Sequence, residues 1–182
     1  RGLTPFYLGQ TRQGLRQIEQ ALKIDPANIY GLWMQAIMLI DDHRAAEADQ
    51  VLKRVEEAPG FSNNMKLLAR HALALERDDP KSAEAFKDLL KFVSDPGQDD
   101  HSQTYVGVVS VGFLARQGKI DDATQLLRAL EYRGQRLHYD WLQENPNLKP
   151  LRNDPRFKEI ASRSRARFDQ MVSTLRSAED RG

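Results

Sequence analysis

The sequence predicts an all-α protein built from stacked helical hairpins. Apolar residues recur at spacings of three and four along most of the chain, and no segment shows the strict alternation that indicates strands. Small residues recur at intervals of 34, 37 and 38 residues, each followed four positions later by Ile or Leu. Such a period is typical of helical hairpin repeats, whose two helices cross closely at a small residue. The pairs are Gly14 and Ile18, Ala48 and Leu52, Ala85 and Leu89, and Ala123 and Leu127.

The first expected helix covers residues 11–24 and buries a stripe that includes Leu15, Ile18 and Leu22. It ends before Pro26, because proline cannot continue a helix and restricts the residue before it. Its partner in the first hairpin would be a short helical stub at residues 5–8. We therefore expect the first repeat to be truncated.

Three complete hairpins are expected to follow, each with a polar turn between its two helices. Asn28 is a candidate N-cap for the second hairpin, and Pro80 suits the first turn of a helix in the third. A polar loop at residues 94–100 precedes the fourth. The three pairs of expected helices cover residues 28–40 and 45–57, 62–76 and 81–93, and 102–116 and 121–132.

Three short segments carry a resemblance to a known repeat family. The turn from Gly118 to Ala123 reads Gly-Lys-Ile-Asp-Asp-Ala, Gly9 to Gly14 reads Gly-Gln-Thr-Arg-Gln-Gly, and Ala21-Leu-Lys-Ile-Asp-Pro ends the first repeat. With these features residues 1–132 resemble tetratricopeptide repeats. The resemblance implies a right-handed α-α superhelix that binds other proteins and carries out no catalysis.

Residues 133–182 form the second expected part of the chain. An irregular connection over 133–154 leads to Asp154 and Pro155, which suit the N-cap and first position of a last helix over 155–177. The segment Leu-Arg-Asn-Asp-Pro-Arg-Phe at 151–157 resembles the end of bacterial multidomain regulators, in which such repeats follow a winged-helix, nucleotidyl cyclase or kinase domain. The resemblance implies a regulatory or sensory segment of a larger bacterial signalling or transcription protein. Because the chain begins with Arg1, we expect it to be a fragment.

Composition limits the classes of function. Charged residues make up 29% of the chain and the net charge is +1, which is typical of an ordinary globular protein. Cysteine is absent, so thiolate metal sites and disulfides are excluded. The longest apolar run, residues 105–115, is too short to span a membrane. We expect a cytoplasmic location, or a periplasmic one if a membrane helix precedes this segment.

Enzyme chemistry has little support in the sequence. The four histidines are scattered without a partner at helical spacing, and the paired carboxylates fall at expected turns. Gly107 and Gly112 have the spacing of a phosphate loop, but Phe113 and Leu114 stand where lysine and a hydroxyl residue are needed. This segment is better interpreted as a buried helix. We expect no catalytic residue, no cofactor and no metal.

A partner-binding groove is expected along the first helices of the hairpins, because these helices line the concave face of such arrays. Aromatic rings beside guanidinium groups suit a peptide of acidic character. Lys66 and Arg70 repeat the Lys-x-x-x-Arg element of the carboxylate-binding subset of tetratricopeptide repeats, although Met34 replaces its asparagine. Core packing is an equal interpretation of Trp33. The expected groove residues are Tyr30, Trp33, Ile37, Lys66, Arg70, Arg77, Tyr105 and Arg116.

The last helix and the function each leave alternatives open. The helix over 155–177 would cap the open end of the array, or it would pair with a second copy in a homodimer. Nucleic-acid binding by this helix is least favoured, because residues 133–182 carry 11 basic and 7 acidic side chains, a net charge of only +4. The main functional hypothesis is a non-catalytic protein-interaction scaffold. The alternatives are a small-molecule sensor with a pocket between the repeats and the 133–154 connection, and a self-assembly module.

Overall fold

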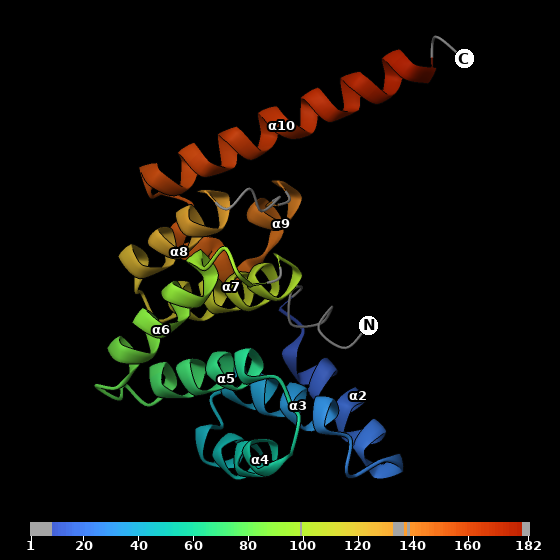
Figure 1. The fold of residues 1–182 in the computed structure, drawn as a ribbon, viewed down its shortest axis with the longest axis vertical. Coiled ribbons are helices and arrows are strands. Elements are labelled where there is room, and N and C mark those ends of the chain that lie inside the picture. The colour runs from blue at the N-terminus through green and yellow to red at the C-terminus, as the bar shows by residue number, and fades with distance from the viewer. Residues whose placement is uncertain (1–8, 99, 133–136, 138, 180–182) are drawn as a thin grey trace.

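The structure, a computed structural model, describes residues 9–98, 100–132, 137 and 139–179, and this part of the chain is helical without a strand (Figure 1). The all-α fold class predicted from the sequence is therefore confirmed. The described helices are α2 (Thr11–Ile24), α3 (Ile29–Asp41), α4 (Ala45–Glu57), α5 (Asn63–Glu76), α6 (Ser82–Ser94), α7 (Asp100–Arg116), α8 (Ile120–Tyr132), α9 (Tyr139–Glu144), the 3₁₀ helix η1 (Pro146–Leu151) and α10 (Pro155–Glu179).

The helix bounds agree closely with the prediction. Helices α2 and α4 cover the predicted residues, and the ends of the other long helices differ by at most two positions. The connection over 133–154 was expected to be irregular, and this expectation is wrong for the two short helices α9 and η1. Both helices have six residues, which is too few to show a helical period in the sequence. The expected stub at residues 5–8 lies outside the described residues.

The turns inside the three complete hairpins share one backbone conformation. His43, Asp78 and Gly118 each follow the first helix of a hairpin and have positive φ angles of 61°, 50° and 69°. A left-handed residue at this position lets the chain satisfy the last carbonyl groups of a helix, and glycine is the residue that adopts it without strain. The closing backbone hydrogen bonds run from Arg44 to Leu39, from Asp79 to Ala74 and from Lys119 to Leu114, each 2.9 Å.

The hairpins stack in chain order. Helix α3 packs against α2, α4 and α5, α5 packs against α6 and α7, and α7 packs against α8 (Figure 1). Gly14, Ala48 and Ala123 are buried at these crossings and Ala85 is partly buried, as their spacing predicted. Helix η1 packs on α7, so the segment after the last hairpin folds back over the array.

Helices α3 and α7 form the centre of the molecule. Nine of the ten side chains of α3 from Leu32 to Asp41 are buried, which leaves this part of the helix without a solvent face. In α7 a methyl group at Gly107 would lie 2.8 Å from Leu130 Cδ2 of α8, so a side chain there would force Leu130 out of its present position. The interpretation of the Gly107 segment as a buried helix is confirmed.

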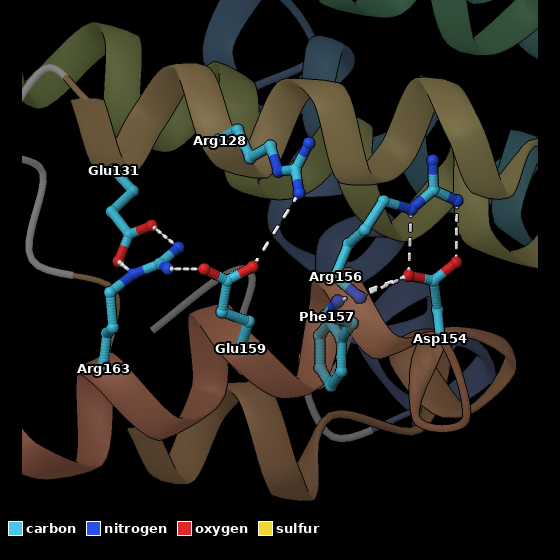
Figure 2. Close-up of polar contacts among 7 residues, drawn as sticks. All are labelled: Arg128, Glu131, Asp154, Arg156, Phe157, Glu159 and Arg163. Atoms are coloured by element: carbon cyan, nitrogen blue, oxygen red, sulfur yellow. Dashed lines mark hydrogen bonds and ion pairs between the residues drawn. The ribbon is translucent and has the colours of Figure 1, made fainter.

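Helix α10 begins with a complete N-cap (Figure 2). The Asp154 carboxylate accepts hydrogen bonds from the backbone N–H groups of Arg156 and Phe157, at 2.8 and 3.4 Å, and two from the Arg156 guanidinium at 2.7 and 3.0 Å. The hydrogen bonds from Arg156 lower the pKa of Asp154 to about 2. Because the carboxylate satisfies backbone donors and holds Arg156, it fixes where the helix starts.

The first half of α10 docks on α8 through apolar and charged contacts. Phe157 and Ile160 are buried in the core, and Arg163 forms a two-pronged ion pair with Glu131 of α8 while also binding Glu159 (Figure 2). The second half of α10 extends past the rest of the fold (Figure 1). Within the described residues no helix combines the length and apolar character that membrane crossing requires.

His71 of α5 is a buried, uncharged side chain. It is 0% exposed, its ring centre lies 6.1 Å from that of Phe86, and neither ring nitrogen has a hydrogen-bond partner in the described structure. Burial lowers the pKa of His71 to about 4. The folded protein therefore holds this imidazole in its neutral form.

We predict that His71 makes the fold less stable in mild acid. The unfolded chain takes up a proton near pH 6.5 and the folded one only near pH 4, so stability is full above pH 6.5 and falls as the pH drops between these values. Between pH 7.5 and pH 5 the free energy of unfolding should fall by about 2 kcal/mol through this group. Urea unfolding of wild type and His71→Leu at both pH values measures it, and a pH dependence unchanged in the variant would contradict it. A variant at the exposed His43 keeps His71 and should keep most of the difference.

Candidate functional site

Trp33 and Ile37 of the expected groove lie inside the molecule rather than along its surface. Trp33 and Ile37 are 0% exposed, and the Trp33 Nε1 group donates a 2.8 Å hydrogen bond to the backbone oxygen of Met65 in α5. The ring of Tyr105 in α7 lies 5.9 Å from that of Trp33, and exposed Tyr30 covers its other side at 5.7 Å. Side chains of α3 and α7 therefore meet, and a partner cannot reach Trp33 or Ile37 from solvent.

Lys66 and Arg70 bind the end of α4. The Lys66 ammonium donates hydrogen bonds to the backbone oxygens of Glu56 and Ala58, at 3.0 and 3.4 Å, and Arg70 pairs with the Glu56 carboxylate at 2.7 Å. A cation at a helix C-terminus offsets the negative end of the helix dipole and satisfies its last carbonyl groups. The Lys-x-x-x-Arg spacing thus has a structural use in joining α5 to α4.

A groove lies where α5 is flanked by α4 and α6, which Figure 1 shows on either side of it. The open space measures about 420 Å³. Helices α4 and α5 each contribute residues spaced i, i+3, i+4 and i+7, the spacing that places side chains on one face of a helix, and the residues of α6 continue this spacing from Lys81 at its N-cap. The lining from these three stripes is Asp49, Leu52, Lys53 and Glu56 of α4, Arg70, Leu73, Ala74 and Arg77 of α5, and Glu84, Ala85 and Asp88 of α6, with Leu67, Asp79 and Lys81 completing it.

The groove combines an apolar floor with charged walls of both signs. Leu52 and Leu73 are buried at its base, while Arg70 pairs with Glu56 and Arg77 with Asp49 at 2.7 and 3.3 Å. Its lining carries four basic and five acidic side chains, a net charge of −1. Ion pairs exposed to this degree contribute about 0 to 1 kcal/mol each, so they can exchange partners at little cost.

Arg116, the last of the expected groove residues, lies elsewhere. Its guanidinium binds the carboxylate of Asp41 at the C-terminal end of α3, and the Thr11 hydroxyl at the start of α2 donates to the same carboxylate. Burial raises the pKa of Asp41, against the lowering effect of Arg116 and of the Thr11 hydrogen bond. A polar pocket of about 410 Å³ opens beside this cluster, between α2, α3, α7 and η1.

The eight expected residues thus divide among three places. Tyr30 and Tyr105 pack on Trp33, and Ile37 is buried in the core. Arg70 and Arg77 line the α5 groove, near Lys66 at the end of α4, and Arg116 lies at the polar pocket. The groove residues of α4 and α6 were missed, although the charged residues at helical spacing, such as Asp49, Lys53 and Glu56, were a usable signal. Within the described residues no group of three or more metal-binding side chains comes together.

The fold and its surfaces define an all-α protein of stacked helical hairpins with a mixed-charge groove and a separate polar pocket. Comparisons of the chain with protein-family models, with curated proteins and with solved structures found no significant match.

We predict that Trp33 acts as a core residue. Replacing Trp33 with alanine removes a fully buried indole and its hydrogen bond to Met65, which should lower the free energy of unfolding by about 3 to 5 kcal/mol. Tyr30→Ala, which removes a half-exposed ring from the same helix, should cost about 1 kcal/mol or less. Urea denaturation followed by circular dichroism compares the two, and similar small losses in both variants would contradict the core assignment.

Proposed function

We propose that this chain is a non-catalytic protein-interaction module that binds a partner segment in the α5 groove. The groove itself carries the proposal, because three helices present matched stripes around an apolar floor. An exposed groove of this kind offers a bound helix or extended peptide several anchoring positions along its length. The expected non-enzymatic role, without cofactor, metal or nucleic acid, stays part of the proposal.

The hairpins themselves are proposed to be tetratricopeptide-like repeats. The support is the common left-handed residue at His43, Asp78 and Gly118 and the buried small residues at the helix crossings. The link to bacterial signalling or transcription proteins, and with it a cytoplasmic location, rests on the resemblance of residues 151–157. Under this proposal the chain is the regulatory segment that receives the partner.

The chemistry of the groove refines the kind of partner. Arg70 and Arg77 can bind acidic side chains of a partner, because their ion pairs with carboxylates of α4 are exposed and weak. Glu84 and Asp88 on the opposite wall can accept basic ones. With a net lining charge of −1, the groove suits a segment that alternates acidic and basic residues around a few apolar ones better than a purely acidic segment.

We predict that a charge exchange in the groove abolishes partner binding without unfolding the protein. The partner is identified by a photo-crosslinking residue at Ala74 in the groove floor, with the same residue at the exposed Ala166 of α10 as the control for non-specific capture. The double variant Glu56→Arg with Arg70→Glu keeps the internal ion pair but reverses its direction. Its affinity for the purified partner should fall at least tenfold in calorimetry.

Two outcomes bear on this prediction. The variant Arg16→Glu reverses an exposed charge on α2, outside the groove, and should bind as wild type. Wild-type affinity in the groove exchange variant, with an unchanged circular dichroism spectrum, would overturn the groove as the binding site.

A second candidate function, self-assembly through α10, is favoured by one observation. The half of α10 that extends beyond the fold exposes Phe168 and Met171, by 42% and 46%. These residues are three positions apart and lie on one face of the helix. Pairing with a second copy would cover them.

We predict under this candidate a dimer that depends on that face. Sedimentation equilibrium between 1 and 100 μM should show a dimer for the wild type and a monomer for Phe168→Arg, because a charge in an apolar helix seam is costly to bury. Ala166→Arg, an exposed change nearby, is the matched control and should leave the dimer intact. A wild type that is monomeric throughout this range would remove the candidate.

A further inference from the structure

The polar pocket beside Arg116 is formed by parts of the chain that are distant in sequence. Its lining comes from the first residues of α2, from Asp41 and Asp42 at the end of α3, from Arg116 of α7 and from Asn147 of η1. Gly9 allows the close approach of α2 to η1, since a methyl group there would lie 2.7 Å from Pro146 Cγ. The pocket therefore lies between the hairpin array and the segment that follows it.

Two hydrogen-bond donors in the pocket lining have no acceptor. Asn147 is 7% exposed and Arg116 is largely buried, and Asn147 Nδ2 and Arg116 Nη2 are buried nitrogens without a hydrogen-bond partner in the described part of the chain. Leaving a buried donor unsatisfied costs about 1 to 3 kcal/mol, so each such group calls for an explanation, of which a bound water, ion or ligand is one. Both nitrogens belong to residues that line the same pocket, so a small side-chain rotation toward it would give them one common acceptor.

The N-terminus of α2 also favours a negative group in the pocket. This helix of 14 residues has Gln10 at its N-cap, and within the described structure the Gln10 side chain makes no capping hydrogen bond. Its first residues line the pocket, where the positive end of the helix dipole favours a negative group. A carboxylate of a ligand would meet Arg116, Asn147 and this helix end together.

The remaining charges of the lining favour a ligand that also carries a positive group. Asp41 and Asp42 offset Arg12 and Arg116, so the four charged side chains of the lining sum to zero. Asp42 pairs with Arg12, whose side chain is 81% exposed, an ion pair that a ligand cation can replace at little cost. A ligand of no net charge with both groups matches the lining best.

We propose that this pocket binds a small zwitterion that presents a carboxylate next to a protonated amine, as a free α-amino acid does. The carboxylate accepts from Asn147 Nδ2 and Arg116 Nη2 near the start of α2, and the ammonium group lies against Asp42 and Asp41. The pocket of about 410 Å³ is much larger than one water molecule and falls in the size range of small-molecule sites. This site is independent of the α5 groove.

The test is a thermal unfolding screen of the full chain with each of the twenty standard amino acids at 5 mM. At least one should raise the melting temperature by about 3 °C or more, because a ligand that binds only the folded state stabilises it by mass action. Sodium acetate and methylammonium chloride at the same concentration are the single-charge controls and should raise it by less than a third as much. An equal rise with acetate would overturn the zwitterion, and no rise with any amino acid would overturn the site.

Two conservative variants locate the binding. Asn147→Asp replaces the orphan donor with an acceptor of the same shape, and Arg116→Lys keeps a charge for Asp41 while removing Nη2. Each variant should bind the amino acid with an affinity at least tenfold lower, measured by calorimetry at a temperature where the variant is folded. Asn153→Asp makes the same change at an exposed position outside the pocket and should bind as wild type. Wild-type affinity in both pocket variants would place the ligand elsewhere and overturn the proposal. Since no variant of this set touches the α5 groove, its failure would leave the partner proposal standing.

Discussion

The burial of α3 on every side is the constraint on which the rest of the structure depends. A helix without a polar face is stable only when neighbours cover its whole circumference, and each fully buried Leu or Ile side chain then contributes roughly 2 kcal/mol. Helices α2, α4 and α5 provide most of this cover, and Tyr105 of α7 meets Trp33 on the remaining part. The indole N–H would be an unsatisfied donor in this core, and the Met65 carbonyl accepts its hydrogen bond.

This central packing also decides which surface is left open. Because the fully buried ring of Trp33 in α3 meets that of Tyr105 in α7, this part of the first helices encloses a core. One exposed side of α5 is the groove that α4 and α6 flank. The arginines of α5 that face this side, Arg70 and Arg77, form exposed ion pairs with carboxylates of α4.

Most of the fold could be predicted from local patterns, and most of the site could not. Helix bounds follow from apolar spacing, Pro26 and the turn residues, all of which act within a few positions of the chain. The face that a helix presents is also local when the helix is amphipathic, but α3 has no polar side, so nothing in its sequence distinguishes an exposed Trp33 from a buried one. Contacts such as Arg116 with Asp41, 75 positions apart, depend on how the array curls.

The cluster around Asp41 is difficult to explain by stability alone. Removing a carboxylate and a guanidinium from water costs several kcal/mol per ion, and apolar side chains of similar size are often as stable or more stable in such places. The raised pKa of Asp41 shows that burial outweighs the help from Arg116 and Thr11. A fold that already has an apolar centre gains little from this polar cluster, whereas a binding site gains charged groups held in fixed positions by three helices. The ligand proposed for the neighbouring pocket would give this buried ion pair a use that the fold alone does not require.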